Sequence, residues 1–460
     1  MPGVMMTSIR IGSAGLRGAG QREPSARARL ARACVCLVAT LIGQSTALAQ
    51  SAPRAPAAPP AAGPNVSNAA RAVHERLLTL DTHLDTPANF ALAGWDILGR
   101  HDPARDGSQV DFPRLVQGGL DGGFWAIYTP QGPRSAEAEH AARDFAIARA
   151  SAIREMVAAH PDRFELALRA DDAARIAASH KRVVFLSMEN GYPVAADPSL
   201  LETFYALGVR LAGPVHFMNN ELADSSTDPK GAEWHGLSSQ GRAFVAEANR
   251  LGIVLDASHA SDEVLDQLIA LSKTPVLLSH SGTKAIFAHP RNIDDDRLRR
   301  LAASGGVIQI NFYSDYLLAT PKIPDREAAF SALWQDARKP GQTLAQREAI
   351  VQRRRQIDAR WPVPRATFED AFAHLLHAIQ VVGIDHVGIG ADFDGGGGVV
   401  GFEDARDYPK ITARLLALHF TVEDIQKVWS GNVLRVLRAA EAYAAQARAV
   451  ASANPLTQPG

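Results

Sequence analysis

Side chains that can bind a metal ion or carry a proton stand at the ends of short apolar segments of this chain. Parallel strands that are buried on both faces appear in a sequence as such segments. In a (β/α)8 barrel the chemistry takes place where the strands meet the following loops. The polar residues at or near the segment ends are Asp85, Tyr128, Glu189, His216, His259, His280, Asn311 and Asp392. The histidine and carboxylate side chains in this set predict a hydrolase with two metal ions.

His83 and Asp85 can bind one of these ions together. Residues two apart on a strand point to the same side, so the imidazole and the carboxylate reach the same point. Glu189 closes the segment 183–188. Its carboxylate has two oxygens and can bridge two cations, which a neutral imidazole cannot do. A capping or surface glutamate is the alternative, but the other ligands in the chain favour a bridging ligand.

His259 and His280 close two consecutive predicted strands. Adjacent strands lie about 4.8 Å apart, so both imidazoles can bind a second ion. A single histidine at a strand end is more often a core residue, whereas two on neighbouring strand ends that face a carboxylate are more often ligands. Nitrogen and oxygen ligands without a thiolate suit zinc, with manganese or cobalt as substitutes.

Asp392, His216 and Asp394 are candidates for catalysis. Asp392 ends the eighth predicted strand, where a carboxylate can take the proton of a metal-bound water. Asp394 is an alternative for that role, but we expect it to be structural because the loop begins there. His216 suits the stabilisation of a carbonyl oxygen that becomes negative. A core histidine is the alternative for His216.

Predicted strands and helices alternate along the chain and would place these residues at one face of a sheet. We predict strands at 77–83, 123–129, 182–188, 209–216, 252–258, 275–280, 306–312 and 386–391. Helices are expected between them, for example over 135–159, 238–250 and 261–272, the last two capped by Ser238 or Ser239 and by Ser261. Strands that alternate with helices predict an α/β fold with a parallel sheet, here a (β/α)8 barrel.

One segment is too long for an ordinary loop of this barrel. Residues 320–362 are rich in charge and are flanked by prolines. We predict a helical insertion after the seventh strand, over or beside the mouth of the active site. A solvated helical face without a catalytic role is an equal alternative. The barrel domain is predicted over 66–446, with an Ala/Pro-rich linker at 50–65 and a flexible tail at 447–460.

Residues 1–49 have the pattern of a secretory signal peptide. Arginines precede the apolar run 33–43, and Ala47 and Ala49 fit the small-residue positions of a cleavage site. A membrane anchor is the alternative, but a run of about 11 residues is short of the roughly 20 that span a bilayer. We therefore predict an exported, periplasmic or secreted protein that is cleaved near Ala49. Met5 or Met6 is an alternative start.

Composition narrows the possible partners. The chain has 460 residues, 46% of them hydrophobic, which is enough for a large core. Both cysteines, Cys34 and Cys36, lie in the predicted signal, so the mature chain has neither a disulfide nor a thiol nucleophile. The mature chain is mildly acidic and has no further segment apolar enough to span a membrane. We therefore expect no nucleic-acid partner.

With these residues the chain resembles the membrane dipeptidase (renal dipeptidase) family, peptidase family M19 of the amidohydrolase superfamily. The resemblance covers about 72–440 and depends on motifs that are specific in combination. They are DTHLDTP at 81–87, GGFWAIY at 122–128, Glu189, the His216 segment VHFMNNELADSS, DASHAS at 256–261, LSHSGT at 278–283, HPRNIDDD at 289–296, INFYSDY at 310–316, GIGADFDG at 388–395 and SGNVLRVL at 430–437.

The resemblance implies a (β/α)8 barrel that binds two zinc ions. It implies one ion held by His83, Asp85 and Glu189. It implies a second ion held by Glu189, His259 and His280. It further implies that His216 and Asp392 act on the substrate, that Arg291 binds the substrate's C-terminal carboxylate, and that the chain can form a homodimer. An arginine suits a carboxylate because its planar fork binds both oxygens.

We therefore predict a zinc dipeptidase that cleaves dipeptides with a free C-terminal carboxylate by attack of a metal-bridging hydroxide. The first alternative is another binuclear metal amidohydrolase that acts on an N-acyl amino acid, a cyclic amide or a lactone. The second is a secreted binding protein without catalysis. Two segments depart from the family pattern: NGYP after Glu189 and the insertion at 320–362. The side-chain preference is therefore not predicted.

Overall fold

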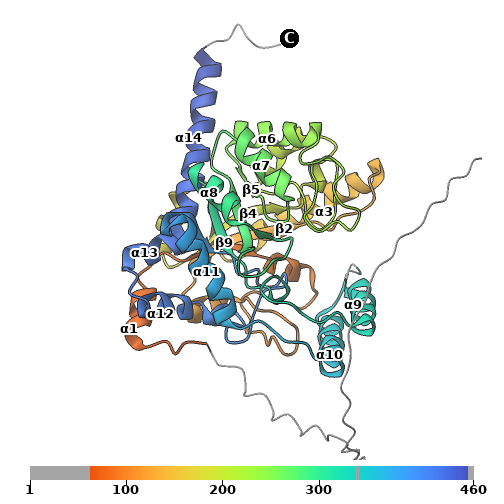
Figure 1. Ribbon diagram of the computed structural model, residues 1–460, viewed down its shortest axis with the longest axis vertical. Coiled ribbons are helices and arrows are strands. Elements are labelled where there is room, and N and C mark those ends of the chain that lie inside the picture. The colour runs from red at the N-terminus through yellow and green to blue at the C-terminus, as the bar shows by residue number, and fades with distance from the viewer. Residues whose placement is uncertain (1–62, 338, 340, 454–460) are drawn as a thin grey trace, which may run out of the picture. The chain divides into compact units, whose positions relative to one another are not determined.

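The computed structural model describes residues 63–337, 339 and 341–453. The predicted signal peptide, its cleavage site and most of the predicted linker lie outside these residues. Strands alternate with helices along the described chain, and the strands lie inside a layer of helices that includes α3, α6, α7, α8 and α11 (Figure 1). The α/β class predicted from the alternation of apolar segments is confirmed.

The strands form two parallel sheets. The first has the order β1-β2-β4-β5-β6, with β3 paired to β4, and the second has the order β10-β9-β7-β8. The strands of the first sheet are β1 (Leu80–Leu84), β2 (Gly122–Tyr128), β3 (Phe164–Leu166), β4 (Arg182–Glu189), β5 (Val209–Ala212) and β6 (Val254–Leu255). Those of the second are β7 (Leu277–Thr283), β8 (Asn292–Ile293), β9 (Val307–Ile310) and β10 (Val387–Ile389).

Two isolated parallel bridges close these sheets into one barrel. Leu84 at the end of β1 pairs with Phe393 beyond β10, and Asp256 beyond β6 pairs with Leu277 of β7. The closed order is therefore β1-β2-β4-β5-β6-β7-β9-β10, which is the predicted (β/α)8 barrel. β3 and β8 were not predicted, because segments of three and two residues carry no periodicity.

Most predicted strands agree with the observed ones, but the fifth and sixth are shorter. We predicted 209–216 and 252–258, whereas β5 ends at Ala212 and β6 at Leu255. Pro214 follows β5 and has no N–H group to donate to a neighbouring strand. After β6, the carboxylate of Asp256 accepts the Ser258 N–H at 2.9 Å, so the backbone leaves the ladder there.

The helices that follow strands β2, β5 and β6 begin at serine caps. The hydroxyls of Ser135, Ser238 and Ser261 accept the amide three residues on, at the starts of α3 (Ala136–Ala159), α6 (Ser239–Leu251) and α7 (Asp262–Leu271). Ser238, not Ser239, is the cap of α6. The other helices of the barrel domain are α1 (Asn68–His74), α2 (Phe112–Gly118), α4 (Asp172–Ala178), α5 (Leu201–Leu207), α8 (Asp295–Ala303), α11 (Phe368–Val382), α12 (Pro409–Ala417), α13 (Val422–Gln426) and α14 (Asn432–Ala453).

Short helical turns connect several of these elements. They are Thr86–Ala91, Tyr192–Val194, Pro198–Leu200, Ser314–Tyr316, Ile384–His386, Ala405–Asp407 and Lys427–Gly431. Helix α14 continues to Ala453, whereas we expected a flexible tail after Gln446. Within the described residues, none of the helices combines the length and the apolar character needed to cross a membrane.

Apolar side chains fill the barrel at the N-terminal end of its strands. Leu80, Phe124 and Phe185 point into it, and the rings of Phe124 and Phe185 stack at 4.9 Å. Val433 and Leu437 of α14 belong to the same buried cluster and close this end. Because apolar packing occupies the N-terminal end of the strands, polar side chains are concentrated at the opposite end.

The predicted insertion after the seventh barrel strand is present as two helices. They are α9 (Pro324–Ala337) and α10 (Leu344–Arg360), which pack on each other at the edge of the barrel (Figure 1). The chain before α10 bonds to the loop after β1 through Ala93, whose N–H donates to Gln342 O and whose carbonyl accepts Leu344 N–H. The insertion therefore packs on the loop that follows His83 and Asp85.

Candidate metal centre

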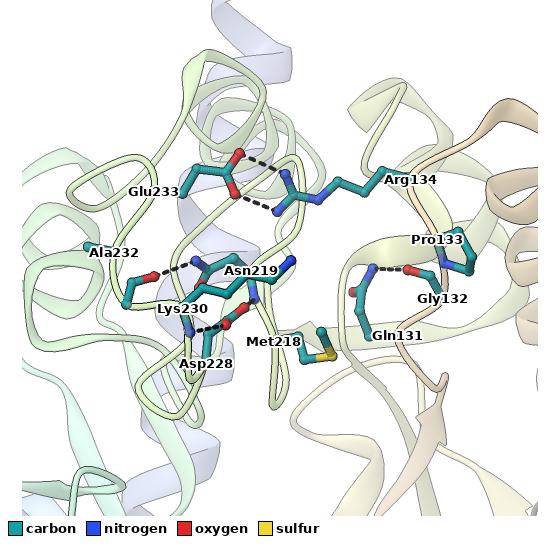
Figure 2. A pocket seen from close by; sticks show the side chains of 11 residues that line it. Gln131, Gly132, Pro133, Arg134, Met218, Asn219, Asp228, Lys230, Ala232 and Glu233 are labelled. Carbon is teal, nitrogen blue, oxygen red and sulfur yellow. Dashed lines mark hydrogen bonds and ion pairs between the residues drawn. The ribbon is translucent and has the colours of Figure 1, made fainter.

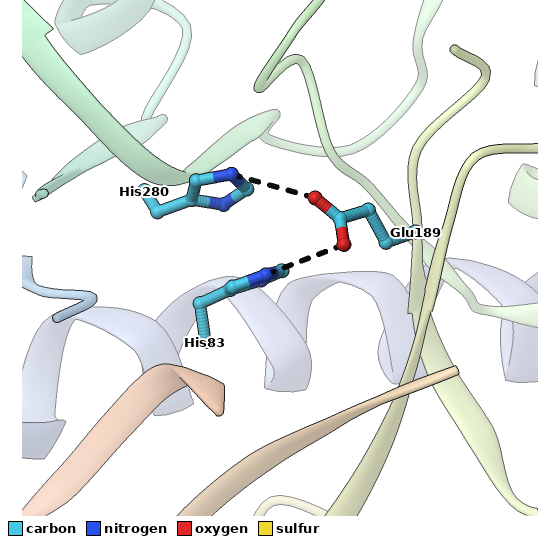
Figure 3. A group of neighbouring side chains, drawn as sticks. All are labelled: His83, Glu189 and His280. Carbon is cyan, nitrogen blue, oxygen red and sulfur yellow. Dashed lines mark ion pairs between the residues drawn. The ribbon is translucent and has the colours of Figure 1, made fainter. Parts of the chain in front are cut away.

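Glu189 lies at the centre of a cluster of polar side chains at the C-terminal ends of the strands. It is the last residue of β4, and its carboxylate faces the neighbouring rings of His83 and His280, with one oxygen directed to each (Figure 3). Its Oε2 is 3.5 Å from His83 Nε2, and its Oε1 is 3.1 Å from His259 Nε2 and 3.6 Å from His280 Nε2. One carboxylate therefore faces ligand atoms from both halves of the barrel.

The remaining predicted site residues adjoin this carboxylate. His83 Nε2 lies 3.2 Å from Asp85 Oδ2, and His216 Nε2 lies 3.5 Å from Glu189 Oε1. Three groups have ligand atoms within 4.8 Å of one another: His83, Glu189 and His280; Glu189, His216 and His259; His83, Asp85 and Asp392. The structure thus brings together all five predicted metal ligands and both predicted catalytic residues.

The chemistry of this cluster fits divalent metal ions. The Nε2 atoms of His259 and His280 face each other at 2.9 Å, and these side chains are buried. Both ring nitrogens of His83 and Nδ1 of His259 are buried without a hydrogen bond. Buried polar atoms are normally paired, so imidazole nitrogens gathered around carboxylates are the donor set expected for zinc or a similar ion.

Burial shifts the protonation of His259 and His280 in the direction that metal binding needs. Burial lowers the pKa of His259 and of His280 well below its usual value, and nearby positive charge adds to the shift. Both imidazoles are therefore neutral, which is the form that binds a metal. Burial opposes the charged form of His83 too, but the carboxylates of Glu189 and Asp85 raise its pKa well above the usual value.

Asp392 has the electrostatic environment of a proton carrier. Burial raises its pKa well above the usual value; His83 opposes the rise, and the negative charges of Asp85 and Glu189 add to it. Asn311 Nδ2 lies 3.4 Å from Asp392 Oδ2 and orients it. A carboxyl group with a raised pKa holds a proton more readily than an ordinary carboxylate, which suits a group that accepts and returns a proton.

Several strand ends at this face have a left-handed backbone. The φ angles are 70° at His259, 62° at Asp392 and 69° at Asn190, a region that non-glycine residues seldom adopt. The Asn190 side chain donates to Thr129 O at 2.9 Å and accepts from Asn220 Nδ2 at 3.1 Å. Asn190 therefore ties the loops after β2, β4 and β5 together in the segment that departs from the family pattern.

Arg291 is a buried cation beside the cluster. Its Nη2 donates to the backbone oxygen of His280 at 2.9 Å, and the guanidinium carbon lies 5.1 Å from the Tyr316 ring centre. Its Nε is buried without a hydrogen bond. Among the residues that the structure describes, Arg291 forms no ion pair with a carboxylate. A buried guanidinium of this kind is suited to an anionic group of a ligand.

Three residues that the sequence argument gave no role also lie at the site. Tyr316 packs under Arg291, the Tyr128 ring is 4.9 Å from that of His216, and Asn311 contacts Asp392. Tyr128 and Asn311 stood at strand ends in the sequence, which was a usable signal. Tyr316 lies in a helical turn after β9, and its position depends on how that turn packs.

A pocket of about 730 Å³ lies beside the cluster. It is formed by the loops after β2 and β5, which are joined by two hydrogen bonds of 2.8 Å between Arg134 and Glu233 (Figure 2). Met218 lines it and follows His216 by two residues, but no predicted ligand lines it. The pocket therefore shares the loop of His216 with the cluster but is not lined by the cluster residues.

Comparison with known proteins identifies the family. Residues 67–451 match the family model described as membrane dipeptidase (peptidase family M19). The chain belongs to this family. The match extends over nearly all of the described chain, so the resemblance expected from the motifs is confirmed, and the chain is an enzyme of the metallo-dipeptidase type.

Relatives and solved structures of the M19 family agree with this assignment. Dipeptidase tcpJ from Claviceps purpurea is 33% identical over 352 residues, which cover 75% of this chain and 73% of that protein. The probable dipeptidase PvdM from Pseudomonas aeruginosa superposes with a TM-score of 0.69 at 29% identity, covering 82% of this chain and 98% of that chain. A Rhodobacter sphaeroides metallo peptidase liganded with a phosphinate mimic of L-Ala-D-Ala gives 0.60 at 26% identity, covering 79% and 99%.

Proposed function

We propose that this chain is an exported, zinc-dependent dipeptidase that hydrolyses dipeptides with a free C-terminal carboxylate. The observation that carries the proposal is the position of Glu189 between two sets of imidazole and carboxylate groups, with the buried Arg291 beside them. The related Rhodobacter sphaeroides enzyme, whose ligand mimics a dipeptide, supports this substrate class.

The residues that would hold the metals follow from the two halves of the cluster. His83, Asp85 and Glu189 would hold one ion. Glu189, His259 and His280 would hold the other. When bound, the ions supply an activated water and a Lewis acid for the peptide carbonyl. The cluster contains no sulfur ligand, which suits zinc and permits manganese or cobalt.

The protein's own side chains complete the reaction. Asp392 accepts the proton of the attacking water and returns it to the amine of the leaving residue, as its raised pKa allows. His216 stabilises the carbonyl oxygen as it becomes negative. Arg291 binds the carboxylate of the leaving residue and holds the substrate in register.

We infer that the position of Arg291 beside a proposed metal ligand selects dipeptides. Arg291 bonds to the backbone of His280, a proposed metal ligand, so the bound carboxylate lies next to the reacting bond. In a dipeptide, one residue separates the reacting bond from the terminal carboxylate. A longer peptide would place its carboxylate beyond Arg291 and leave the guanidinium without a partner.

Hydrolysis of an N-acyl amino acid is the second candidate function. Such a substrate has the same terminal carboxylate, so Arg291 does not distinguish it from a dipeptide. The pocket between the loops after β2 and β5 offers room for a larger acyl group. The two functions differ in whether a free amino terminus is required.

A substrate panel with controlled metal content tests the proposal. We expect zinc-loaded enzyme to cleave L-L and L-D dipeptides and to leave N-acetylated and tripeptide controls nearly intact. Elemental analysis should find about two ions per chain, and His259→Ala should lose one of them with nearly all activity. Preferred cleavage of the N-acetylated compounds would support the second candidate, and full activity with one ion would contradict the two-metal proposal.

Export is a separate part of the proposal and depends on residues outside the described structure. The predicted signal peptide covers 1–49, and cleavage after Ala49 would leave Gln50 as the first residue. N-terminal sequencing of the protein from the periplasm or medium should therefore begin at Gln50. Retention of residues 33–43 in a membrane fraction would contradict it. The predicted homodimer is tested by the mass of the purified protein in solution.

A further inference from the structure

The barrel has two seams, each where the two sheets meet through a single bridge. One lies between β1 and β10 and the other between β6 and β7. A buried aspartate stands at each seam and accepts a backbone N–H from the strand across it. Asp81 accepts from Ala391 N at 2.9 Å, and Asp256 accepts from Ser279 N at 3.0 Å. In both cases the amide belongs to the residue before a proposed site residue, Asp392 or His280.

The seam at Asp256 reaches the side chain of a proposed ligand. Oδ1 of Asp256 accepts the N–H groups of Ser258 and Ser279, and Oδ2 accepts the Ser279 hydroxyl. The same hydroxyl lies 2.9 Å from Nδ1 of His280. Asp256, Ser279 and His280 are all buried, with exposures of 6%, 0% and 1%.

The direction of these hydrogen bonds follows from the donors available. A carboxylate can only accept, so the single proton of the Ser279 hydroxyl points to Asp256. The hydroxyl oxygen can then only accept from His280, which places the imidazole proton on Nδ1. The lone pair of His280 is left on Nε2, the atom that faces Glu189 and His259.

We propose that Asp256 is a positioning residue for the metal centre, which acts through Ser279 to fix the proton of His280 on Nδ1 and leave Nε2 to bind a metal. The inference rests on the proposed function in that His280 must be a ligand. The inference assigns a role to Asp256, which is not itself a proposed metal ligand. Groups that orient a metal-binding histidine in this way commonly change metal affinity about 10–100-fold when removed.

The substitution Asp256→Asn tests the direction of the bonds. The amide oxygen of the asparagine would keep the two backbone N–H groups, and its NH2 would then face the Ser279 hydroxyl. The hydroxyl would accept from that NH2 and donate to Nδ1 of His280, which moves the imidazole proton to Nε2. We expect one of the two zinc ions to bind about 10–100-fold more weakly in competition with a chelator.

The double variant Asp256→Asn with Ser279→Ala separates this mechanism from a loss of packing. Without the hydroxyl nothing donates to Nδ1 of His280, so the double variant should bind zinc more tightly than Asp256→Asn alone. If the two substitutions only weakened packing, the second would weaken zinc binding further or leave it unchanged, and the double variant would not bind zinc more tightly than Asp256→Asn. Ser279→Ala alone should weaken zinc binding less than Asp256→Asn. If the Asp256→Asn protein does not fold, the zinc affinity of Ser279→Ala tests the same contact.

Asp121→Asn is the matched control. Asp121 is a partly buried carboxylate that also accepts a backbone N–H, from Thr79 at 3.0 Å, but it lies at the opposite end of the barrel strands. We expect a lower melting temperature of the metal-free protein with zinc affinity unchanged. If wild-type protein binds two ions and Asp256→Asn binds them equally well, or if the double variant binds more weakly still, the inference is wrong. If wild-type protein binds no zinc, the proposed function fails first.

Discussion

Two aspartates that are two residues apart show how environment divides roles between identical side chains. Asp392 is buried, Asp394 is partly buried, and both have a left-handed backbone. The oxygens of Asp394 accept the Gln109 N–H and the Thr86 hydroxyl, each at 2.7 Å. Asp392 has the Asn311 amide at 3.4 Å and otherwise faces the cluster. Asp394 therefore ties loops together, and Asp392 remains able to move a proton.

Asp392→Asn should slow the chemical step without removing the metals. The asparagine keeps size and polarity but cannot accept a proton, and general acid–base contributions are about 10²–10⁴-fold. We expect kcat to fall by about that factor, KM to change far less, and two ions per chain to remain by elemental analysis. Asp394→Asn is the control and should mainly lower thermal stability. Wild-type kcat in the Asp392 variant would exclude it as the proton carrier.

Arg291→Ala should change substrate recognition more than it changes the metals. The variant loses a charge-assisted contact to the carboxylate of the leaving residue. We expect kcat/KM to fall strongly for free dipeptides and much less for the same dipeptides with an amidated C-terminus. Equal losses for free and amidated substrates would show that Arg291 does not bind the carboxylate.

The ends of the barrel strands carry the proposed metal ligands. Hydrogen bonds across the seams between the two sheets hold these strand ends at fixed distances from one another. Asp81 accepts the His83 N–H at 2.8 Å, the Ala391 N–H, and the Tyr408 hydroxyl at 2.7 Å. This one carboxylate therefore links β1, the end of β10 and the helical layer. The insertion helices α9 and α10 have a different role, because they pack on the loop after β1 and not on any ligand.

Leu333→Ala should loosen the insertion without affecting the metal centre. Leu333 is the fully buried side chain of α9, and removing such a side chain costs about 2–5 kcal/mol. We expect faster hydrogen exchange over 324–360, with unchanged exchange in the barrel strands and unchanged metal content. Gln335→Ala, a substitution at an exposed neighbour, is the control. A higher KM in the Leu333 variant would show that the insertion shapes the mouth of the site, whereas unchanged kinetics would favour a solvated helical pair.

For the whole molecule, two buried histidines away from the metal centre couple stability to pH. Nδ1 of His74 lies 2.7 Å from the Thr412 hydroxyl and Nε2 lies 3.0 Å from Gly118 O, so its ring joins α1, α2 and α12. His374 Nδ1 accepts the Thr283 N–H at 2.9 Å and joins α11 to β7. Burial lowers the pKa of each imidazole to about 4.

These lowered pKa values predict loss of stability in acid. The unfolded chain binds a proton at each histidine near pH 6.5, while the folded chain does so only near pH 4. Above pH 6.5 the titration of these two histidines therefore does not change the free energy of unfolding. The free energy of unfolding decreases as the pH falls from 6.5 toward 4, by about 3 kcal/mol for each histidine. Urea unfolding of the metal-free protein at pH 7 and pH 4 measures it. His74→Gln should reduce the difference between the two pH values, whereas His140→Gln, at an exposed position, should not.

Local chemistry in the sequence was enough to predict the barrel and most of the site. Most barrel strands contain a buried apolar run. Such runs, and serine caps such as Ser261, are properties of short segments. Because parallel strands of a barrel end at the same face, polar residues at the run ends had to converge. The insertion was visible for the same reason, as a charged segment too long for a loop. The short strands β3 and β8 left no such pattern.

Contacts between segments that are distant in sequence were decided only by the tertiary structure. The bridge between Leu84 and Phe393, the packing of Tyr316 under Arg291, and the docking of the insertion on the loop after β1 each join segments whose separation no local pattern constrains. The hydrogen bond that Ser279 N–H donates to Asp256 depends in addition on which strands become neighbours when the two sheets close. Local sequence patterns therefore predicted which residues lie at the C-terminal ends of the strands. Which of these residues contact one another follows from the closure of the barrel, because the distances between them depend on the packing of the whole chain.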